Sequence, residues 1–348
     1  MGFCGIVEDK VDAVERSEGS AGATPEPVSA GGWRNAGKRV LLPLLLCFSA
    51  WAAFGQQHRP ALIDVHEHFN GEPGVLDRLL GKLNRVDGMG FLLVTPKGMA
   101  QARQAIADHP NRFAGICDLN IDAPGVLDQV DRCQRAGFIG LGEITTTLRN
   151  YDDRAYWPVY ERAQRYHMIL LFHTGIVQRL TPEIPQDASF DRMRSTRLDL
   201  IARRFPKLIV IGAHLGNPDY AESAEIARWN PNLYFDLSGS SLIKTKGDYT
   251  IFRSIFWWSG VVSPHTPGAA SAFSKLVFGS DVFGGDSEEF DRELDRYHKM
   301  LDACGQPADV QQLVFSGNVW RILERRKADL AAAGATAGRV PGDGAAKR

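Results

Sequence analysis

Residues 61–70 read ALIDVHEHFN, an apolar run that ends in His66, Glu67 and His68. Side chains alternate between the two faces of a β-strand, so His66 and His68 are predicted to project together, with Glu67 turned away. Two imidazoles aimed at one point form half a metal site, because neutral imidazole binds zinc and similar divalent ions. The plainer alternative is a pair of surface histidines at a strand end, and this stretch alone does not decide between the two.

Seven more apolar runs follow, and a helix-like stretch comes after each. The predicted strands cover residues 61–70, 90–96, 112–121, 138–147, 169–175, 208–216, 233–238 and 275–281. Apolar strands that alternate with helices are typical of a parallel sheet covered by helices. Eight such units predict an α/β protein with a closed (β/α)₈ TIM barrel, whose active site lies at the C-terminal ends of the strands. No GxGxxG motif follows the first strand, which argues against a dinucleotide-binding fold.

The two ends of the chain are predicted to lie outside this barrel. Basic residues precede the apolar run VLLPLLLCFSAWAAF (40–54), a pattern typical of a secretory signal peptide rather than a membrane anchor. We therefore expect a poorly ordered extension with a signal peptide over 1–57, a barrel over 58–326 and a disordered tail over 327–348. The signal peptide predicts export, to the periplasm, with membrane contact only through this segment.

The net charge bears on the partners that the chain can bind, and the cysteine content bears on disulfide formation. The formal net charge of the 348-residue chain is −1, which gives no electrostatic reason to expect nucleic acid. Beyond the signal peptide the chain keeps Cys117, Cys133 and Cys304. Three is an odd number, so no complete disulfide framework is predicted. Each of the three lies in an apolar or helical context, and we interpret each as a buried small hydrophobic residue.

Polar residues at the predicted strand ends converge in such a barrel. Besides His66 and His68 they are Glu143, His173, His214 and Asp281, on the fourth, fifth, sixth and eighth strands. All strand C-termini face one rim, so these residues are expected to share one pocket. Four of the nine histidines fall at such ends. This placement favours the metal-site interpretation over chance.

The chain resembles the amidohydrolase superfamily, and specifically its amidohydrolase-related (type 2) branch. The motifs that carry the resemblance are IDVHEHF (63–69), GLGEI (140–144), LLFHTG (170–175), VIGAHLGNPD (210–219) and LVFGSDVFGG (276–285), and it covers about residues 61–323. The resemblance implies that His66, His68, His173 and Asp281 bind one divalent ion, most often zinc, and leaves a second ion open. It implies that Asp281 takes a proton from water and that His214 orients substrate or stabilises negative charge.

Glu143 departs from the superfamily pattern, because many binuclear members carry a carboxylated lysine at the end of the fourth strand. Its absence fits a mononuclear site. GLGEI is also similar to the fourth-strand motif of TatD-like deoxyribonucleases, in which the glutamate bridges two metals. We therefore keep two interpretations of Glu143, a bridging ligand and an acceptor that orients a ligand histidine. Asp236 is a further candidate to line the pocket.

The resemblance implies an exported metal-dependent hydrolase that acts on a small-molecule amide, ester or lactone. The alternative is a nonoxidative decarboxylase of the same branch, and a further alternative is a TatD-like binuclear phosphodiesterase. A decarboxylase has to anchor a substrate carboxylate, usually with arginine, and no arginine lies at a predicted strand end. The expected partner is a small-molecule substrate, with a homodimer left open. The other histidines, at positions 58, 109, 167, 265 and 298, are expected to be solvated.

Overall fold

The computed structural model describes residues 58–177, 187–245, 247–258 and 272–337. The predicted extension and signal peptide (1–57) and His265 lie outside these residues. Within the described ranges, no helix combines the length and the apolar character that crossing a membrane requires.

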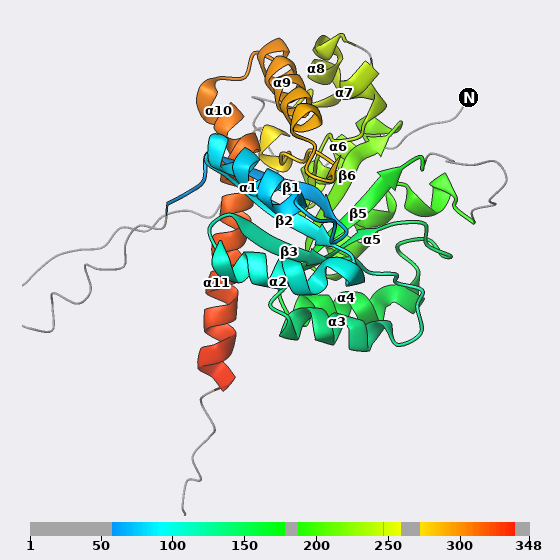
Figure 1. The fold of residues 1–348 in the computed structure, drawn as a ribbon. Helices are drawn as coiled ribbons and strands as arrows, with labels where there is room; N and C mark the ends of the chain where they lie inside the picture. Colours follow the sequence, from blue (N-terminus) through cyan, green and yellow to red (C-terminus); the bar gives the residue numbers. More distant parts are fainter. Residues whose placement is uncertain (1–57, 178–186, 246, 259–271, 338–348) are drawn as a thin grey trace, which may run out of the picture. The chain divides into compact units, whose positions relative to one another are not determined.

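Eight parallel strands form a single curled sheet, which confirms the predicted TIM-barrel fold (Figure 1). The order of the strands across the sheet is β7-β6-β5-β4-β3-β2-β1-β8, so neighbours in the sequence are neighbours in the sheet, apart from β8, which pairs with β1. The strands are β1 (Leu62–Phe69), β2 (Gly88–Val94), β3 (Phe113–Cys117), β4 (Gly140–Ile144), β5 (Ile169–Gly175), β6 (Ile209–Asn217), β7 (Leu233–Phe235) and β8 (Val282–Phe283).

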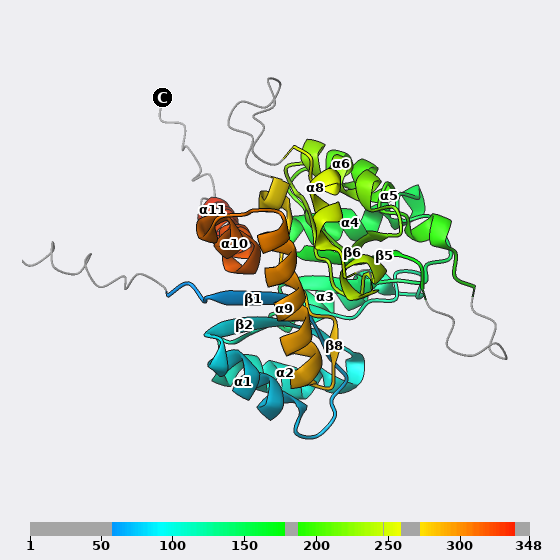
Figure 2. The ribbon, with the colours of Figure 1, turned by 90° about the horizontal axis from the view of Figure 1, so that it is seen from above.

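Helices cover the outer face of the sheet. Figure 2 shows α1 and α2 beside β2, and α1 also contacts α9. The α-helices are α1 (Val75–Arg85), α2 (Met99–Asp108), α3 (Val126–Arg135), α4 (Trp157–Arg165), α5 (Arg197–Arg204), α6 (Tyr220–Trp229), α7 (Ser241–Thr245), α8 (Phe252–Ile255), α9 (Ser287–Ala303), α10 (Ala308–Gln312) and α11 (Asn318–Ala337).

The eighth strand differs from the prediction of residues 275–281, because β8 covers only Val282–Phe283. The predicted segment nevertheless closes the barrel. Val277 N–H donates to the carbonyl of Phe235 at 2.9 Å, and Val65 N–H donates to the carbonyl of Phe278 at 3.0 Å. Asp281 N–H also donates to the carbonyl of His66 at 2.9 Å, so the segment joins the two edges of the sheet with isolated hydrogen bonds rather than a regular ladder.

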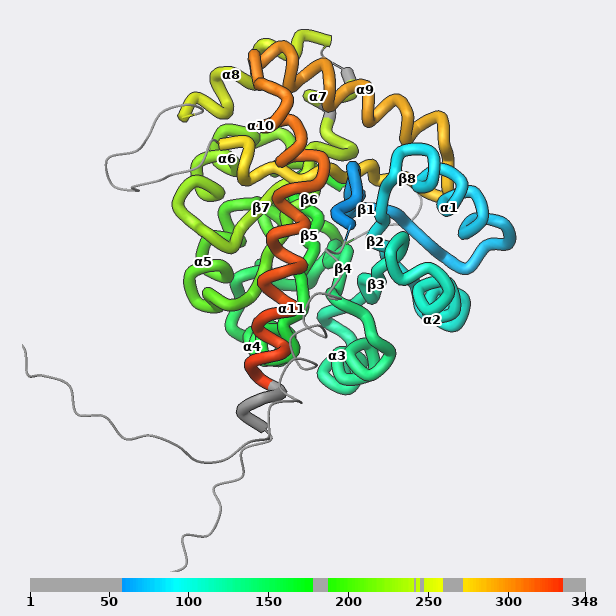
Figure 3. The backbone as a smooth tube through the Cα atoms, turned by 90° about the vertical axis from the view of Figure 1, so that its left-hand side faces the viewer, coloured from blue at the N-terminus to red at the C-terminus, as the bar shows by residue number. Residues whose placement is uncertain are grey.

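Two apolar clusters form the core. The larger one packs between the outer face of the sheet and the helices. The smaller one is enclosed by the strands and takes alternate residues of β1, β2, β3, β5 and β6, for example Ile169 and Leu171 of β5 and Ile209 and Ile211 of β6. Val319 and Ile322 of α11 join this inner cluster, and Figure 3 shows α11 crossing in front of the strands. The outward residues Leu170 and Phe172 belong to the larger cluster.

Two further predictions need correction. Cys117 at the end of β3 and Cys133 of α3 are both buried, as expected, but they form a disulfide instead of packing as separate thiols. Sequence reasoning missed the pair because the strand-to-helix packing that brings their Cα atoms to 6.0 Å was not visible. The predicted disorder from residue 327 is also wrong over residues 327–337, because the alanine-rich segment continues α11 to Ala337, and residues 338–348 lie outside the described residues.

Candidate metal centre

A β-bulge turns the two histidines of β1 into the barrel. Val65 belongs to the inner cluster, so strict alternation would send His66 to the helix side. The register of β1 against β2 shifts between Asp64 and Glu67, which marks the bulge. Bulges often redirect side chains beside active sites, and here His66 and His68 both end up facing the interior.

A similar irregularity in β4 lets Glu143 reach the barrel interior. Leu141 and Ile144 of β4 both pack in the outer cluster, and the register of β4 against β5 shifts between them. Gly142 has φ of +140°, and a Cβ on it would lie 2.4 Å from the Leu171 carbonyl oxygen. Only glycine fits this position, and its backbone conformation lets the following Glu143 point inward.

The third irregularity is at the end of β6. Ala213 belongs to the inner cluster, yet His214 directly after it also faces the interior. His214 and Leu215 have φ of +66° and +46°, which breaks the alternation, and the β5–β6 register shifts between His173 and Gly175. His173 itself needs no such device, because it continues the inward positions of β5.

We call His66, His68 and Asp281 the first ligand group. One potential ligand atom from each lies within 4.8 Å of the others. Asp281 Oδ1 is 3.1 Å from His68 Nε2 and 3.5 Å from His66 Nε2. In a tetrahedral zinc site with bonds of about 2.0–2.1 Å, neighbouring ligand atoms are about 3.3 Å apart. These separations therefore match those of ligands around one ion.

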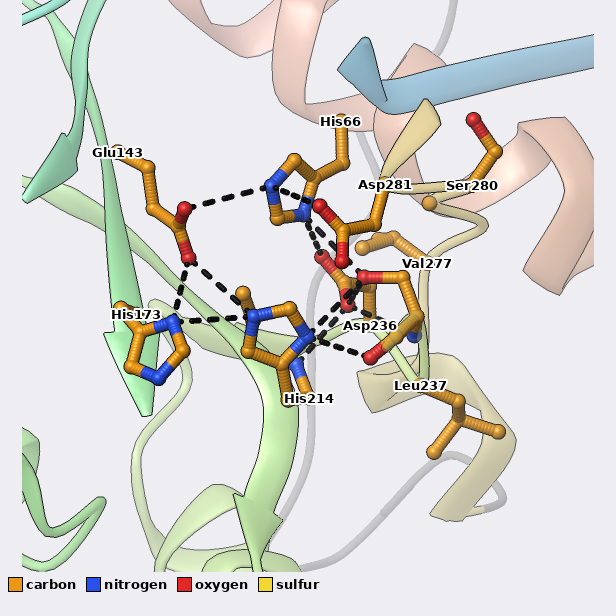
Figure 4. A network of polar contacts seen from close by, with 12 residues as sticks. His66, Glu143, His173, His214, Asp236, Leu237, Val277, Ser280 and Asp281 are labelled. Atoms are coloured by element: carbon orange, nitrogen blue, oxygen red, sulfur yellow. Dashed lines mark hydrogen bonds and ion pairs between the residues drawn. The ribbon is translucent and has the colours of Figure 1, made fainter. Parts of the chain in front are cut away.

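We call Glu143, His173 and His214 the second ligand group, which satisfies the same distance criterion. Glu143 Oε1 is 3.0 Å from His173 Nδ1 and 3.3 Å from His214 Nε2. Its other oxygen faces the first group, 3.7 Å from His66 Nε2 and 4.0 Å from His68 Nε2. Figure 4 shows the Glu143 carboxylate between His66 on one side and His173 and His214 on the other.

All six residues singled out at the strand ends are thus brought together. The histidines at positions 58, 109, 167 and 298 belong to neither group. Sequence reasoning missed three neighbours of the site. Ser238 contacts the His66 and His214 rings, Phe283 stacks on His68 with ring centroids 3.9 Å apart, and Asp118 follows β3. Burial raises the pKa of Asp118, and the charges of His68 and Glu143 also act on it. Its place after an apolar strand was the available signal.

The pKa values of residues in the two ligand groups are set by burial and by the charges of their neighbours in the cluster. Burial lowers the pKa of His66, but Asp281 and Glu143 outweigh burial and raise this pKa well above its usual value. Burial raises the pKa of Glu143, and the surrounding imidazoles outweigh it and hold this pKa well below its usual value. The pKa of Asp281 is lowered and that of His214 raised by the same competition. Carboxylates in this cluster are therefore ionised, as metal binding requires.

The surroundings of one buried atom, His66 Nε2, indicate whether these residues suit a cation. His66 is fully buried and its Nε2 has no hydrogen-bond partner, although Glu143 and Asp281 face it. A buried ring nitrogen without a partner costs free energy, and a metal ion would satisfy it. Histidine nitrogens with carboxylate oxygens are a donor set typical of zinc and other divalent first-row ions. The residues present fit a divalent ion.

Comparison with known proteins identifies the family. A family model described as amidohydrolase matches residues 82–325. The chain belongs to the amidohydrolase family. The match begins in α1 and leaves out His66 and His68, so the assignment of the first ligand group rests on the geometry above. A search of curated proteins gives no match for this amidohydrolase.

Solved structures share the fold of this amidohydrolase at low identity. A TIM-barrel protein from Bordetella bronchiseptica is 14% identical with a TM-score of 0.55, over 76% of this chain and 99% of that chain. A 2,6-dihydroxybenzoate decarboxylase from Rhizobium is 14% identical with a TM-score of 0.51, over 77% and 99%. A probable 2-pyrone-4,6-dicarboxylic acid hydrolase from Acinetobacter baumannii is 13% identical with a TM-score of 0.51, over 75% and 98%. The fold thus accommodates both hydrolases and decarboxylases, so it does not fix the reaction of this chain.

Proposed function

We propose that this amidohydrolase is a metal-dependent hydrolase that cleaves an amide, ester or lactone bond of a small molecule with an activated water. The observation that carries the proposal is the cluster of six ligand-type side chains at the carboxyl ends of the strands, where TIM barrels have their active sites. A divalent ion held there supplies Lewis acidity and lowers the pKa of a water from 15.7 to about 7.

The chain's own residues then have separate tasks. The ionised Asp281, whose side chain is 18% exposed, accepts the proton of the attacking water as a general base. His214 has its Nδ1–H directed at the Ser238 carbonyl and its Nε2 directed toward Glu143 and His173. When protonated it is placed to stabilise the negative charge that develops on the substrate oxygen.

The surroundings of the cluster support hydrolysis over decarboxylation. In the described ranges, the side chains that form hydrogen bonds or ion pairs with the six residues are imidazoles, carboxylates and Ser238, and none is an arginine or lysine. A decarboxylase needs a cation for the substrate carboxylate, whereas a neutral amide, ester or lactone does not. The Glu143 carboxylate faces both ligand groups and therefore also suits a second ion, as in hydrolytic enzymes with two-metal sites.

The first experiment is to measure metal per chain by plasma mass spectrometry on protein purified without chelator, then after adding Zn²⁺ or Mn²⁺. We expect at least one ion. Two ions would make Glu143 a bridging ligand, and one ion would make it an acceptor that orients His173. The matched variant is Glu143→Gln, which keeps the shape and removes the charge. It should lose the second ion in the first case and keep the single ion in the second. No ion after addition would overturn the proposal.

Activity is then measured on panels of amides, esters and lactones with chelated, metal-restored and Asp281→Asn protein. Hydrolysis that disappears with chelator and returns with metal supports the proposal. Release of CO₂ from aromatic acids without hydrolysis of any panel member would assign the decarboxylase reaction instead.

We also propose that the protein is exported to the periplasm, zinc being the expected ion there. The Cys117–Cys133 disulfide supports this, because disulfides persist in oxidising compartments and are rare in the cytosol. Cell fractionation followed by N-terminal sequencing tests the proposal. A mature chain that begins near residue 57 in the periplasmic fraction is expected, and full-length protein confined to the cytosol would contradict it.

A further inference from the structure

We infer that Asp236, in the loop after β7, is the positioning residue that sets which ring nitrogens of His66 and His214 face the metal site. This inference rests on the proposed function, since it concerns the same site. It goes further by assigning the ligand atoms and the residue that fixes them.

Asp236 uses its two carboxylate oxygens on the two ligand groups separately. Its Oδ2 lies 3.2 Å from His66 Nδ1. Its Oδ1 accepts the backbone N–H of His214 at 3.0 Å, the backbone N–H of Ser238 at 3.0 Å and the Ser238 hydroxyl at 2.6 Å. The carboxylate is fully buried, so none of these contacts is replaced by bulk water. One side chain therefore connects both halves of the site, as Figure 4 shows.

The contact with His66 determines its tautomer. A carboxylate oxygen can only accept, so His66 Nδ1 carries a proton, and in the neutral ring that binds a metal the lone pair lies on Nε2. That Nε2 is the buried nitrogen without a partner that faces Asp281 and Glu143. A carboxylate behind a ligand histidine is a common arrangement in metal sites, where it orients the ring and raises its basicity.

Asp236 acts on His214 through the backbone. By holding the His214 N–H and the Ser238 N–H on one oxygen, it fixes the Ser238 carbonyl as the acceptor for His214 Nδ1. His214 Nε2 is thereby the nitrogen that faces Glu143. The loop lies tightly against both groups, because a Cβ on Gly239 would be 2.7 Å from Asp281 Oδ2 and 2.7 Å from His214 Nδ1.

The decisive variant is Asp236→Asn. Three donors surround the Oδ1 position, so the asparagine oxygen takes that place and its NH₂ faces His66 Nδ1. Nδ1 must then accept, and the ring proton moves to Nε2, the nitrogen needed for the ion. We expect Zn²⁺ affinity, measured by competition with a chelator, to fall about 10- to 100-fold.

Asp64→Asn is the matched control. Asp64 is equally buried and its Oδ1 accepts the backbone N–H groups of His66 and Ser280, but it forms no hydrogen bond or ion pair with the His66 ring. Thermal unfolding of both variants measures the structural cost. If the two variants lose Zn²⁺ affinity and stability in the same proportion, Asp236 has only a structural role and the inference is overturned.

Nitrogen-15 NMR of histidine-labelled wild-type protein gives a readout that needs neither a substrate nor a folded variant. We expect a slowly exchanging proton bonded to His66 Nδ1, both with Zn²⁺ and without it. A His66 ring that carries its proton on Nε2 alone would overturn the inference. A protein with the expected tautomer and Zn²⁺ affinity but no hydrolase activity would refute only the proposed function.

Discussion

Glu143 and Glu67 are carboxylates near strand ends, the first largely and the second fully buried, but they lie on opposite faces of the sheet. Glu143 faces the barrel interior among imidazoles, which hold its pKa well below the usual value. Glu67 faces the helix layer, where burial raises its pKa well above the usual value despite the ion pair with Lys82 of α1. Lys82 Nζ also lies 4.2 Å from the ring centroid of Phe290 in α9.

The difference separates a ligand site from a structural contact. Lys82 already occupies the place beside the Glu67 carboxylate, whereas imidazoles offer lone pairs to an added ion. We therefore expect changes in the interior to affect metal binding and catalysis, and changes in the helix layer to affect stability.

The largest effect on catalysis is expected from Asp281→Asn. The amide cannot accept the proton of the attacking water, and general-base catalysis typically contributes about 10²- to 10⁴-fold to the rate. We expect kcat to fall by that factor, measured by steady-state kinetics on an active panel substrate. Thermal unfolding of the metal-free variant is the control, and a loss of activity explained by unfolding would remove the distinction between the two faces.

On the helix side, Lys82→Met should leave Glu67 without its cation. Removal of one partner of a buried ion pair typically costs about 3–5 kcal/mol of unfolding free energy. Urea unfolding at neutral pH measures this cost. The double variant Lys82→Met with Glu67→Gln should recover most of it, because no charge is then buried unpaired. A double variant as unstable as the single one would mean that packing of Lys82, rather than charge, accounts for the loss.

The sequence predicted which side chains of β1 lie on the same side of the strand. It did not predict equally well which side faces the barrel interior. The HxH pattern correctly placed His66 and His68 together with Glu67 opposite, because that needs only the two-residue period of a strand. It did not indicate that the pair faces inward, since Val65 already does so and a bulge is needed between them. Bulges depend on how neighbouring strands pair, which one chain's periodicity does not contain. The inward turns of Glu143 and His214 have the same origin.

The resemblance to the amidohydrolase superfamily supplied what the periodicity of the strands did not. Its ordered motifs indicated that the site residues lie at one rim of the barrel. It gave no information on contacts between the sheet and the helices. The Lys82–Glu67 pair and the Cys117–Cys133 disulfide both join a strand to a helix of the outer layer, and neither was predicted. Such contacts depend on how a helix rotates and shifts against the sheet.

The disulfide gives a second test of the helix layer. It closes a loop with a sequence separation of 16 residues, for which loop-closure entropy predicts about 3 kcal/mol of stabilisation. We expect Cys117→Ala with Cys133→Ala to lose about that much unfolding free energy in urea, and a thiol reductant to reproduce the loss in wild type only. Zn²⁺ affinity should be unchanged in the folded variant. A large loss of affinity would show that the two faces are coupled.

The smallest expected effect concerns Glu293 of α9, another carboxylate of the helix layer. Burial raises its pKa to about 7, and Lys244 and Arg296 beside it only partly oppose burial. Between its usual pKa of about 4.5 and 7, the folded protein therefore holds a proton that the unfolded chain has lost. Stability from this group is present below about pH 4.5 and is lost as the pH rises through 7.

Glu293→Gln removes this titration while keeping the size of the side chain. From pH 5.5 to pH 8, about 1.5 pH units of the window are covered, which corresponds to about 2 kcal/mol. The stability of the variant relative to wild type should rise by that amount over the range, in urea unfolding at each pH. A difference that stays constant would mean that Glu293 is ionised throughout and fully paired with Arg296. The helix layer would then contain a carboxylate that is charged like Glu143, and the pKa direction alone would no longer distinguish the two faces.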